Sequence, residues 1–289
     1  MAWVNYNANI CDKKISSIII HLTKECPNSC SFCIDKLNKF KQKGRPNFDK
    51  IKETFLKYKD NVDAVLITGG EPLLYIEETL DLMKYIKANS DLPIVIDTSM
   101  PIQCYNNREA FYEIISLAES FLVSAHHYNP EKADIIRHSK TKYDREAFYK
   151  ELPEKDKFLM SLNVFKPHLC DKQEVLDSIM YFNRLGFKNI KLAEMFNMDD
   201  MYVSIGKLLG IKLKRPFAQG CTNSNVDISH LLPEFDGNLS VKTVCFYRCK
   251  HCYPNLLDLF KILTRNLFKI KKYFFGVIHP DGEIYPYWI

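Results

Sequence analysis

The sequence lacks any run of apolar residues close to the ~18 that a membrane-spanning helix requires, which argues against a transmembrane protein. Its first residues, Met-Ala-Trp-Val-Asn-Tyr, have neither the basic nor the apolar region of a secretory signal peptide, and we therefore expect a cytoplasmic protein. There is no internal repeat or low-complexity tract. The net charge of +5 is small for 289 residues and does not by itself indicate a nucleic-acid partner.

Cysteine, in contrast, is abundant. The chain has 10 cysteines, and seven of them fall into two clusters. Because disulfides are rare in the reducing cytosol, we interpret these residues as metal ligands or free thiols. The composition, 46% hydrophobic and 26% charged, is that of an ordinary globular protein, and the length fits one large domain or a barrel with a small appendage.

Short β-branched runs alternate with amphipathic stretches from about residue 17 to 195, which predicts an α/β protein with a parallel sheet. The predicted strands are Ser17–Leu22, Val62–Thr68, Pro93–Thr98, Phe121–Ala125, Phe158–Val164 and Asn189–Glu194. The predicted helices lie near 48–59, 75–88, 107–119, 144–152 and 171–186, the last with Asp171 as N-cap and Gly186 as C-cap. After about residue 205 the alternation stops, and we expect two domains, 1–205 and 206–289.

Three cysteines follow the first predicted strand in the sequence Cys26-Pro-Asn-Ser-Cys30-Ser-Phe-Cys33. Three thiolates on one tight loop can hold three irons of a cubane cluster and leave the fourth iron for a cofactor. Zinc is the alternative, but a structural zinc ion takes four ligands, and no fourth cysteine or histidine is near. Gly69-Gly70-Glu71-Pro72 ends the second predicted strand, and parallel strands bring their carboxyl ends to the same rim.

These two motifs, in this order, resemble the radical S-adenosylmethionine (SAM) superfamily, which has a CxxxCxxC loop with an aromatic residue before its last cysteine, here Phe32, and a GGE motif after the second strand. The resemblance implies a partial (β/α)6 TIM-like barrel, a [4Fe-4S] cluster on Cys26, Cys30 and Cys33, and SAM on its open iron. It also implies an oxidoreductase or isomerase-type enzyme that cleaves SAM reductively and abstracts a substrate hydrogen with the 5′-deoxyadenosyl radical. A reductase or flavodoxin-type protein would supply the electron.

The resemblance further implies which residues contact SAM. The Gly69–Pro72 segment, including the Glu71 carboxylate, would receive the SAM ammonium group, and Phe32 would lie near the adenine. Contacts to the ribose or carboxylate are expected from four polar residues at the ends of strands, for which capping or turn roles are the alternative: Thr98, Ser99, Ser124 and Asn163.

The second cysteine group repeats the same spacing near the end of the chain, at Cys245, Cys249 and Cys252, and Cys221 lies 24 residues before it. Four cysteines make a complete ligand set. The segment resembles the SPASM and Twitch extensions of radical SAM enzymes, which implies one auxiliary [4Fe-4S] cluster for electron transfer or substrate binding. A zinc site on the same four cysteines is the alternative.

The substrate is less clearly indicated. A basic stretch from His126 to about Tyr143 would suit an anionic ligand at the barrel rim, although we favour a solvated loop there. An apolar and basic helix over about 256–272 is expected to cover a core. Our first hypothesis is a small polar or nucleotide-like substrate. Two alternatives stay open: a maturase of ribosomal peptides, despite the little chain before Cys26 for a leader-binding domain, and a non-catalytic Fe–S or zinc module that binds nucleic acid.

Overall fold

The structure is a computed structural model, and it describes residues 17–33, 35, 41–42, 44–139, 141–196, 200–213, 223–245 and 275–285. These residues form one sheet of 10 strands in the order β10-β9-β1-β2-β3-β4-β5-β6-β8-β7. The strands are β1 (Ser17–His21), β2 (Ala64–Thr68), β3 (Ile94–Thr98), β4 (Ser120–Ser124), β5 (Phe158–Val164), β6 (Asn189–Phe196), β7 (Asn223–Val226), β8 (Asn238–Cys245), β9 (Phe275–Ile278) and β10 (Ile284–Tyr285). Strands β1 to β6 pair consecutively and in parallel, which confirms the predicted parallel α/β sheet.

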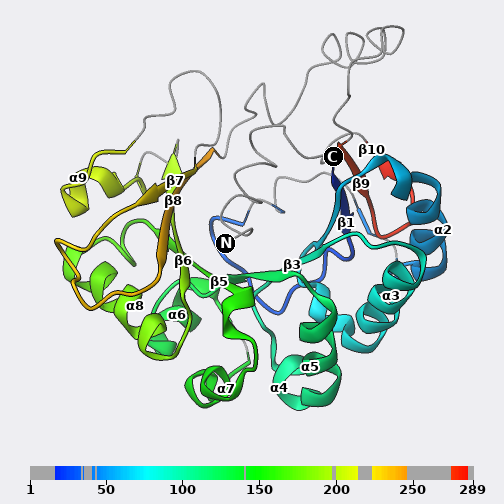
Figure 1. The fold of residues 1–289 in the computed structure, drawn as a ribbon, viewed down its shortest axis with the longest axis horizontal. Helices are drawn as coiled ribbons and strands as arrows, with labels where there is room; N and C mark the ends of the chain where they lie inside the picture. Colours follow the sequence, from blue (N-terminus) through cyan, green and yellow to red (C-terminus); the bar gives the residue numbers. More distant parts are fainter. Residues whose placement is uncertain are drawn as a thin grey trace, which may run out of the picture.

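The sheet is strongly curved, and the helices lie along its convex side (Figure 1). They are α2 (Phe48–Tyr58), α3 (Ile76–Asn89), α4 (Ile102–Asn106), α5 (Arg108–Leu117), α6 (Pro130–Arg137), α7 (Arg145–Glu151), α8 (Lys172–Arg184) and α9 (Ile205–Leu209). Side-chain caps begin several of them: Asp171, for example, accepts hydrogen bonds from Gln173 N and Glu174 N, as predicted. Gly186 lies two residues past the end of α8 with a φ of +95°. No helix in the part of the chain described above is long and apolar enough to span a membrane.

The two faces of the sheet differ in chemistry. Alternate strand residues face the helices and form the main apolar core, as Ile18, Ile67 and Ile96 do on the first three strands. The residues between them face the concave side, where a small apolar cluster is made by Val95 and Leu159 with the half-buried Leu66 and Leu122. The described helices therefore cover the convex face of the sheet.

The strands beyond residue 205 continue the same sheet. Strand β8 pairs in parallel with β6, and β7 pairs antiparallel with β8. Strand β9 pairs in parallel with β1, and β10 turns back on β9 at Gly282, so that β9 and β10 form a hairpin. The strands on both sides of residue 205 belong to one sheet, and the two-domain division at that residue stays a prediction. The apolar-basic helix near 256–272 lies outside the described residues.

Candidate functional site

The first cysteine motif lies on the loop that follows β1, and we call residues 22–33 the cysteine loop. Cys26 is exposed, and Cys30 and Cys33 are half-buried. The Cys33 backbone N donates to Cys30 O at 3.3 Å, which closes a tight turn between these two residues. Partial desolvation, together with the nearby Glu71 carboxylate and the other two thiols, raises the pKa of Cys26 to about 12, although a hydrogen bond from the Asn28 backbone opposes it.

The described residues contain no group of three or more His, Cys, Asp or Glu side chains arranged around a single metal ion. A cubane does not require such a group, because each of its three cysteines binds a different iron. Three thiols on one loop, with the fourth position open, are the donor set that such a cluster requires.

Gly69 and Gly70 hold the cysteine loop against the end of β2. Backbone hydrogen bonds join the two segments from Leu22 N to Thr68 O at 2.8 Å and from Gly70 N to Thr23 O at 2.5 Å. A Cβ on Gly69 would lie 2.5 Å from Thr23 O, and one on Gly70 would lie 2.3 Å from the backbone O of Glu25. Only glycine permits this approach, and Gly69 also has a φ of +141°. The glycines thus shape the rim on which the cysteine loop rests.

Glu71 is a buried acceptor that joins β2 to β3. Its side chain is 1% exposed. One oxygen, Oε1, accepts from Thr98 Oγ1 at 2.6 Å and from Leu73 N at 3.2 Å. The other, Oε2, accepts from Ser99 N at 2.7 Å and from Ser99 Oγ at 2.6 Å. Burial raises the pKa of this carboxyl, and the hydrogen bonds from Ser99 and Thr98 offset only part of that effect.

These contacts locate several of the predicted SAM-binding groups. The Glu71 carboxylate and the Thr98 and Ser99 hydroxyls bind one another in the structure, so they support the rim from within. Pro72 begins a short 3-10 turn, Pro72–Tyr75, and is buried. Their direct contacts with SAM stay predictions, and the backbone of Gly69 and Gly70 is the part of the motif closest to the cysteine loop.

The cysteine loop is held at two further points. The Asn28 side chain donates to Ser99 Oγ at 2.9 Å, which links the loop to the Glu71 group. The backbone O of Arg137, the last residue of α6, accepts from Ser29 N at 2.8 Å and from Cys30 Sγ at 3.7 Å. The loop is therefore tied to β3 on one side and to α6 on the other.

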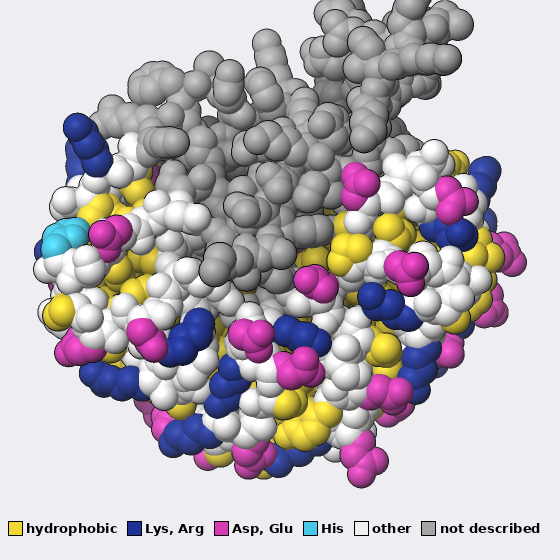
Figure 2. All heavy atoms as spheres, viewed as in Figure 1, with side chains coloured by type: hydrophobic (Ala, Val, Ile, Leu, Met, Phe, Trp, Pro, Cys, Tyr) yellow, Lys and Arg dark blue, Asp and Glu magenta, His cyan; other side chains and the backbone are white. Residues whose placement is uncertain are grey.

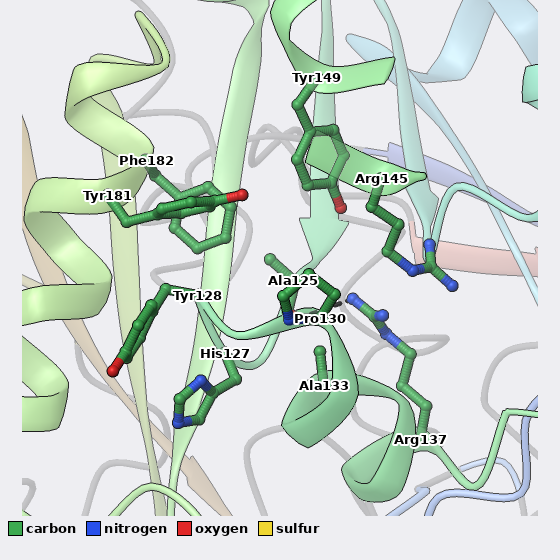
Figure 3. A pocket seen from close by; sticks show the side chains of 10 residues that line it. All are labelled: Ala125, His127, Tyr128, Pro130, Ala133, Arg137, Arg145, Tyr149, Tyr181 and Phe182. Carbon is green, nitrogen blue, oxygen red and sulfur yellow. Dashed lines mark hydrogen bonds between the residues drawn. The ribbon is translucent and has the colours of Figure 1, made fainter. Parts of the chain in front are cut away.

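Arg137 and Arg145 form a buried pair behind the ends of β3 and β4, and Figure 3 shows their guanidinium groups next to each other at a small pocket. Arg137 is 1% exposed and donates to the carbonyls of Ser124 at 2.9 Å and Ala125 at 2.6 Å. Arg145 donates to Met100 O at 3.2 Å. Carbonyl oxygens at strand ends thus bind most of this buried positive charge, and burial together with Arg145 lowers the pKa of Arg137.

Asp134 is the carboxylate beside this pair. Its Oδ1 lies 3.8 Å from Nη1 of Arg137 and 3.6 Å from Nε of Arg145.

The basic stretch after β4 was expected to be a solvated loop, and this expectation is wrong for Arg137, His126 and His127, which are all buried. The carbonyl ends of parallel strands supply the acceptors that make burial of the arginine possible.

Phe32 packs inside the protein, edge-on to the rings of His126 and Phe165 with centroids 5.1 and 5.0 Å away. Burial and nearby cations, first Arg137, keep the pKa of His126 well below its usual value, so this imidazole is neutral. Ser124 ends β4 and Asn163 lies in β5, and both side chains are half-buried. The contacts of Phe32, Ser124 and Asn163 with SAM stay predictions.

Of the auxiliary cysteines, Cys221, Cys249 and Cys252 lie outside the described residues, and only the backbone of Cys245 is described, as the last residue of β8. Sequence reasoning missed three residues that hold the cysteine loop or the rim around it: Asn28, Arg137 and Arg145. The signals were the place of Asn28 inside the cysteine motif and, for Arg137, the basic character of the stretch after β4. Arg145 lies after that stretch, in the helix predicted near 144–152, and had no signal.

Comparisons with known proteins agree with this geometry. The family model described as the radical SAM superfamily matches residues 20–199. GTP 3′,8-cyclase of Campylobacter jejuni subsp. doylei is 34% identical over 93 residues, which cover 31% of this chain and 28% of the cyclase. The chain thus matches less than a third of that relative's length.

Among solved structures, SuiB of Streptococcus suis bound to the precursor peptide SuiA superposes with a TM-score of 0.58 at 15% identity, covering 98% of this chain and 62% of SuiB. SuiB bound to S-adenosylmethionine gives a TM-score of 0.57, again at 15% identity, with 98% and 61% covered. These likenesses show the fold, and this chain spans less than two thirds of SuiB. With the three-cysteine loop, the glycine pair beneath it and a family match over residues 20–199, the chain belongs to the radical SAM superfamily.

Proposed function

We propose that this protein binds a [4Fe-4S] cluster through Cys26, Cys30 and Cys33, cleaves SAM reductively and abstracts hydrogen from a small polar substrate. The observation that carries the proposal is the close fit of the cysteine loop onto Gly69 and Gly70, where even a methyl group would collide with the loop backbone. When bound, the cluster and SAM supply the electron and the radical, which the protein itself lacks.

The chain's own residues provide position and shielding. The three cysteines supply thiolates from one loop, and Gly69 and Gly70 let the backbone of that loop pack directly against the end of β2. Glu71, Asn28 and Arg137 fix the loop relative to β3 and α6 through the hydrogen bonds described above. The cluster ligands are therefore held in place before any cofactor binds, which reduces the cost of ordering them.

The test is anaerobic reconstitution with iron and sulfide, followed by SAM and dithionite and detection of 5′-deoxyadenosine. The Cys26/Cys30/Cys33→Ala triple variant is expected to lose both the N-terminal cluster and the product. Cys170→Ala is the matched control, since Cys170 is a half-buried free thiol outside both motifs, and it is expected to retain the product. Wild-type protein with an intact N-terminal cluster that leaves SAM uncleaved would contradict the proposal.

We also propose an auxiliary [4Fe-4S] cluster on Cys221, Cys245, Cys249 and Cys252, with zinc as the alternative. In support of this site, β8 runs parallel to β6, so its last residue, Cys245, lies at the same rim of the sheet as the cysteine loop. The triple cysteine variant separates the two sites. It is expected to retain about four irons per chain, whereas one zinc ion and no iron would favour the alternative.

For the substrate, we propose a nucleotide-like molecule, and the sequence likeness to GTP 3′,8-cyclase over 93 residues supports this choice. A ribosomal peptide is the second candidate, because SuiB, whose fold this chain shares, binds a precursor peptide. A non-catalytic nucleic-acid module receives less support: on the face shown in Figure 2, Lys and Arg side chains are interspersed with Asp and Glu rather than gathered into a basic region. An electron donor of the reductase or flavodoxin type and a cytoplasmic location belong to the same proposal.

A further inference from the structure

The small pocket beside the two buried arginines lies among α6, α7 and α8, behind the end of β4, and we call it the arginine pocket (Figure 3). Its lining includes Arg137 of α6, Arg145 and Tyr149 of α7, and Phe182 of α8. Tyr149 and Phe182 also belong to the main apolar core, so the pocket is on the helix side of the sheet. About 10 Å³ of it is open to the centre of a water molecule, which is close to the least space that one bound water requires.

Two hydrogen-bond donors at this pocket have no acceptor among the described residues. Arg137 Nη1 is buried and makes no hydrogen bond, although Nε and Nη2 of the same guanidinium group donate to the carbonyls of Ser124 and Ala125. The hydroxyl proton of Tyr149 has no acceptor in this part of the chain either, and both side chains belong to residues that are at most 3% exposed. Burial of such a donor is costly unless it is satisfied, and an ordered water molecule is one common acceptor.

Asp134 supplies an acceptor next to these donors. Its Oδ1 is buried and accepts no hydrogen bond from a described residue, and it lies 3.8 Å from Arg137 Nη1 and 3.6 Å from Arg145 Nε. Both distances exceed the normal hydrogen-bond length, and polar atoms at such separations can be bridged by water.

The donors and the acceptor match one water molecule rather than an anion. A water molecule can accept from Arg137 Nη1 and from the Tyr149 hydroxyl, and it can donate to Asp134 Oδ1. A halide ion accepts hydrogen bonds but cannot donate one to the carboxylate. Three hydrogen bonds are also the usual number for a buried water.

The same arginine contacts the cysteine loop through its backbone. The carbonyl O of Arg137 accepts from Ser29 N at 2.8 Å and from Cys30 Sγ at 3.7 Å. A contact that fixes the guanidinium group of Arg137 therefore also limits the movement of this carbonyl, and with it the position of Cys30.

We propose that one ordered water molecule in the arginine pocket joins Arg137, Tyr149 and Asp134, and that Tyr149 and Asp134 are thereby positioning residues for Cys30. The importance of Cys30 rests on the proposed function, in which its thiolate binds iron. The water molecule and the order of the cysteine loop require neither iron nor SAM, so both are tested on the apoprotein.

The first experiment is a crystal structure of the apoprotein, with the full chain and with crystals soaked in bromide. The expected result is a single peak without anomalous signal, about 2.7–3.2 Å from Arg137 Nη1, Tyr149 Oη and Asp134 Oδ1. An anomalous peak would identify a halide ion and overturn the inference. A pocket without density, or a direct hydrogen bond between Arg137 Nη1 and Asp134, would do the same.

The second experiment measures hydrogen exchange at Ser29 in the apoprotein. Tyr149→Phe removes one hydrogen bond to the water and is expected to speed this exchange about 5-fold. Asp134→Leu removes the acceptor and is expected to speed it about 10-fold. The matched control is Glu131→Leu, at an exposed carboxylate of the same helix, and it is expected to exchange as wild type does.

Asp134→Asn separates a water bridge from a direct ion pair. The bridge requires an oxygen acceptor, which Asn keeps, whereas an ion pair with the arginines requires the negative charge. Exchange at Ser29 is therefore expected to rise by no more than about 3-fold, with the water peak retained. An effect equal to that of Asp134→Leu, or wild-type exchange in Tyr149→Phe, would contradict the inference. Because neither experiment uses SAM, a failure here is distinguishable from a failure to form 5′-deoxyadenosine.

Discussion

Replacement of Glu71 is expected to destabilise the protein more than any exposed substitution. In Glu71→Ala the hydroxyls of Thr98 and Ser99 can rotate toward other acceptors, whereas the backbone N–H groups of Ser99 and Leu73 cannot. A buried N–H without a partner costs about 1–3 kcal/mol. With both N–H groups left without a partner, the free energy of unfolding is expected to fall by about 4 kcal/mol. Glu71→Gln keeps the volume and one carbonyl oxygen, and about half of that loss, ~2 kcal/mol, is expected.

The assay is urea unfolding of the full chain, followed by circular dichroism, in the absence of iron. pH provides a second readout. Because burial raises the pKa of Glu71 above its usual value of 4.5, the folded state binds the proton more tightly than the unfolded state does. The contribution of this group to stability is therefore largest below the unfolded pKa and falls as the pH rises through the raised folded pKa. Glu71→Gln removes that decline, so wild type and variant are expected to differ more near pH 4 than near pH 7.

Two outcomes would refute this reasoning. A loss below about 1 kcal/mol in Glu71→Ala would mean that the carboxylate does not satisfy the two N–H groups. An equal loss for Gln and Ala would mean that the volume of the side chain, rather than its hydrogen bonds, is what stabilises the rim.

The other predictions concern the same rim. Gly70→Ala is expected to displace the cysteine loop and to reduce the iron content after reconstitution, because its Cβ would lie 2.3 Å from a backbone oxygen. The control is Gly210→Ala, where φ is +70° and a Cβ would have nothing within 4 Å. This variant tests backbone strain alone and is expected to retain the iron. Arg137→Met is expected to lower the free energy of unfolding by about 3 kcal/mol and to speed hydrogen exchange at Ser29, measured by mass spectrometry of the apoprotein. Arg108→Met, at a partly exposed ion pair on α5, is expected to change neither, and equal protection of Ser29 in both variants would contradict the role of Arg137.

The parallel strands were largely predictable from the sequence. A strand buried on both faces appears as a continuous apolar run, and Phe158–Val164 was predicted with the bounds that the structure shows. The membership of β7 and β8 in the sheet was not predicted, because Asn223–Val226 is short and polar and its pairing depends on residues far away in the sequence.

The candidate site was predictable where chemistry requires a fixed spacing, as for the three cysteines and the glycine pair. It was not predictable where tertiary contacts decide the role of a side chain. Arg137 is charged and lies in a basic stretch, so it was assigned to solvent, yet strand-end carbonyls make it one of the most buried residues. The contact of Glu71 with SAM stays a prediction, but the hydrogen bonds that both its oxygens accept from neighbouring strands and turns did not follow from the sequence.

The pairing of β9 with β1 has a consequence for synthesis of the chain. Strand β1 carries the cysteine loop at its end, and within the part of the chain that the structure describes one of its edges pairs with residues 275–278. During translation that edge stays unpaired until residues 275–278 have left the ribosome, and an unpaired apolar edge strand is a site for misassociation. The sheet beside the cysteine loop is therefore completed long after the loop itself has been made, which favours insertion of the cluster after β9 has been added.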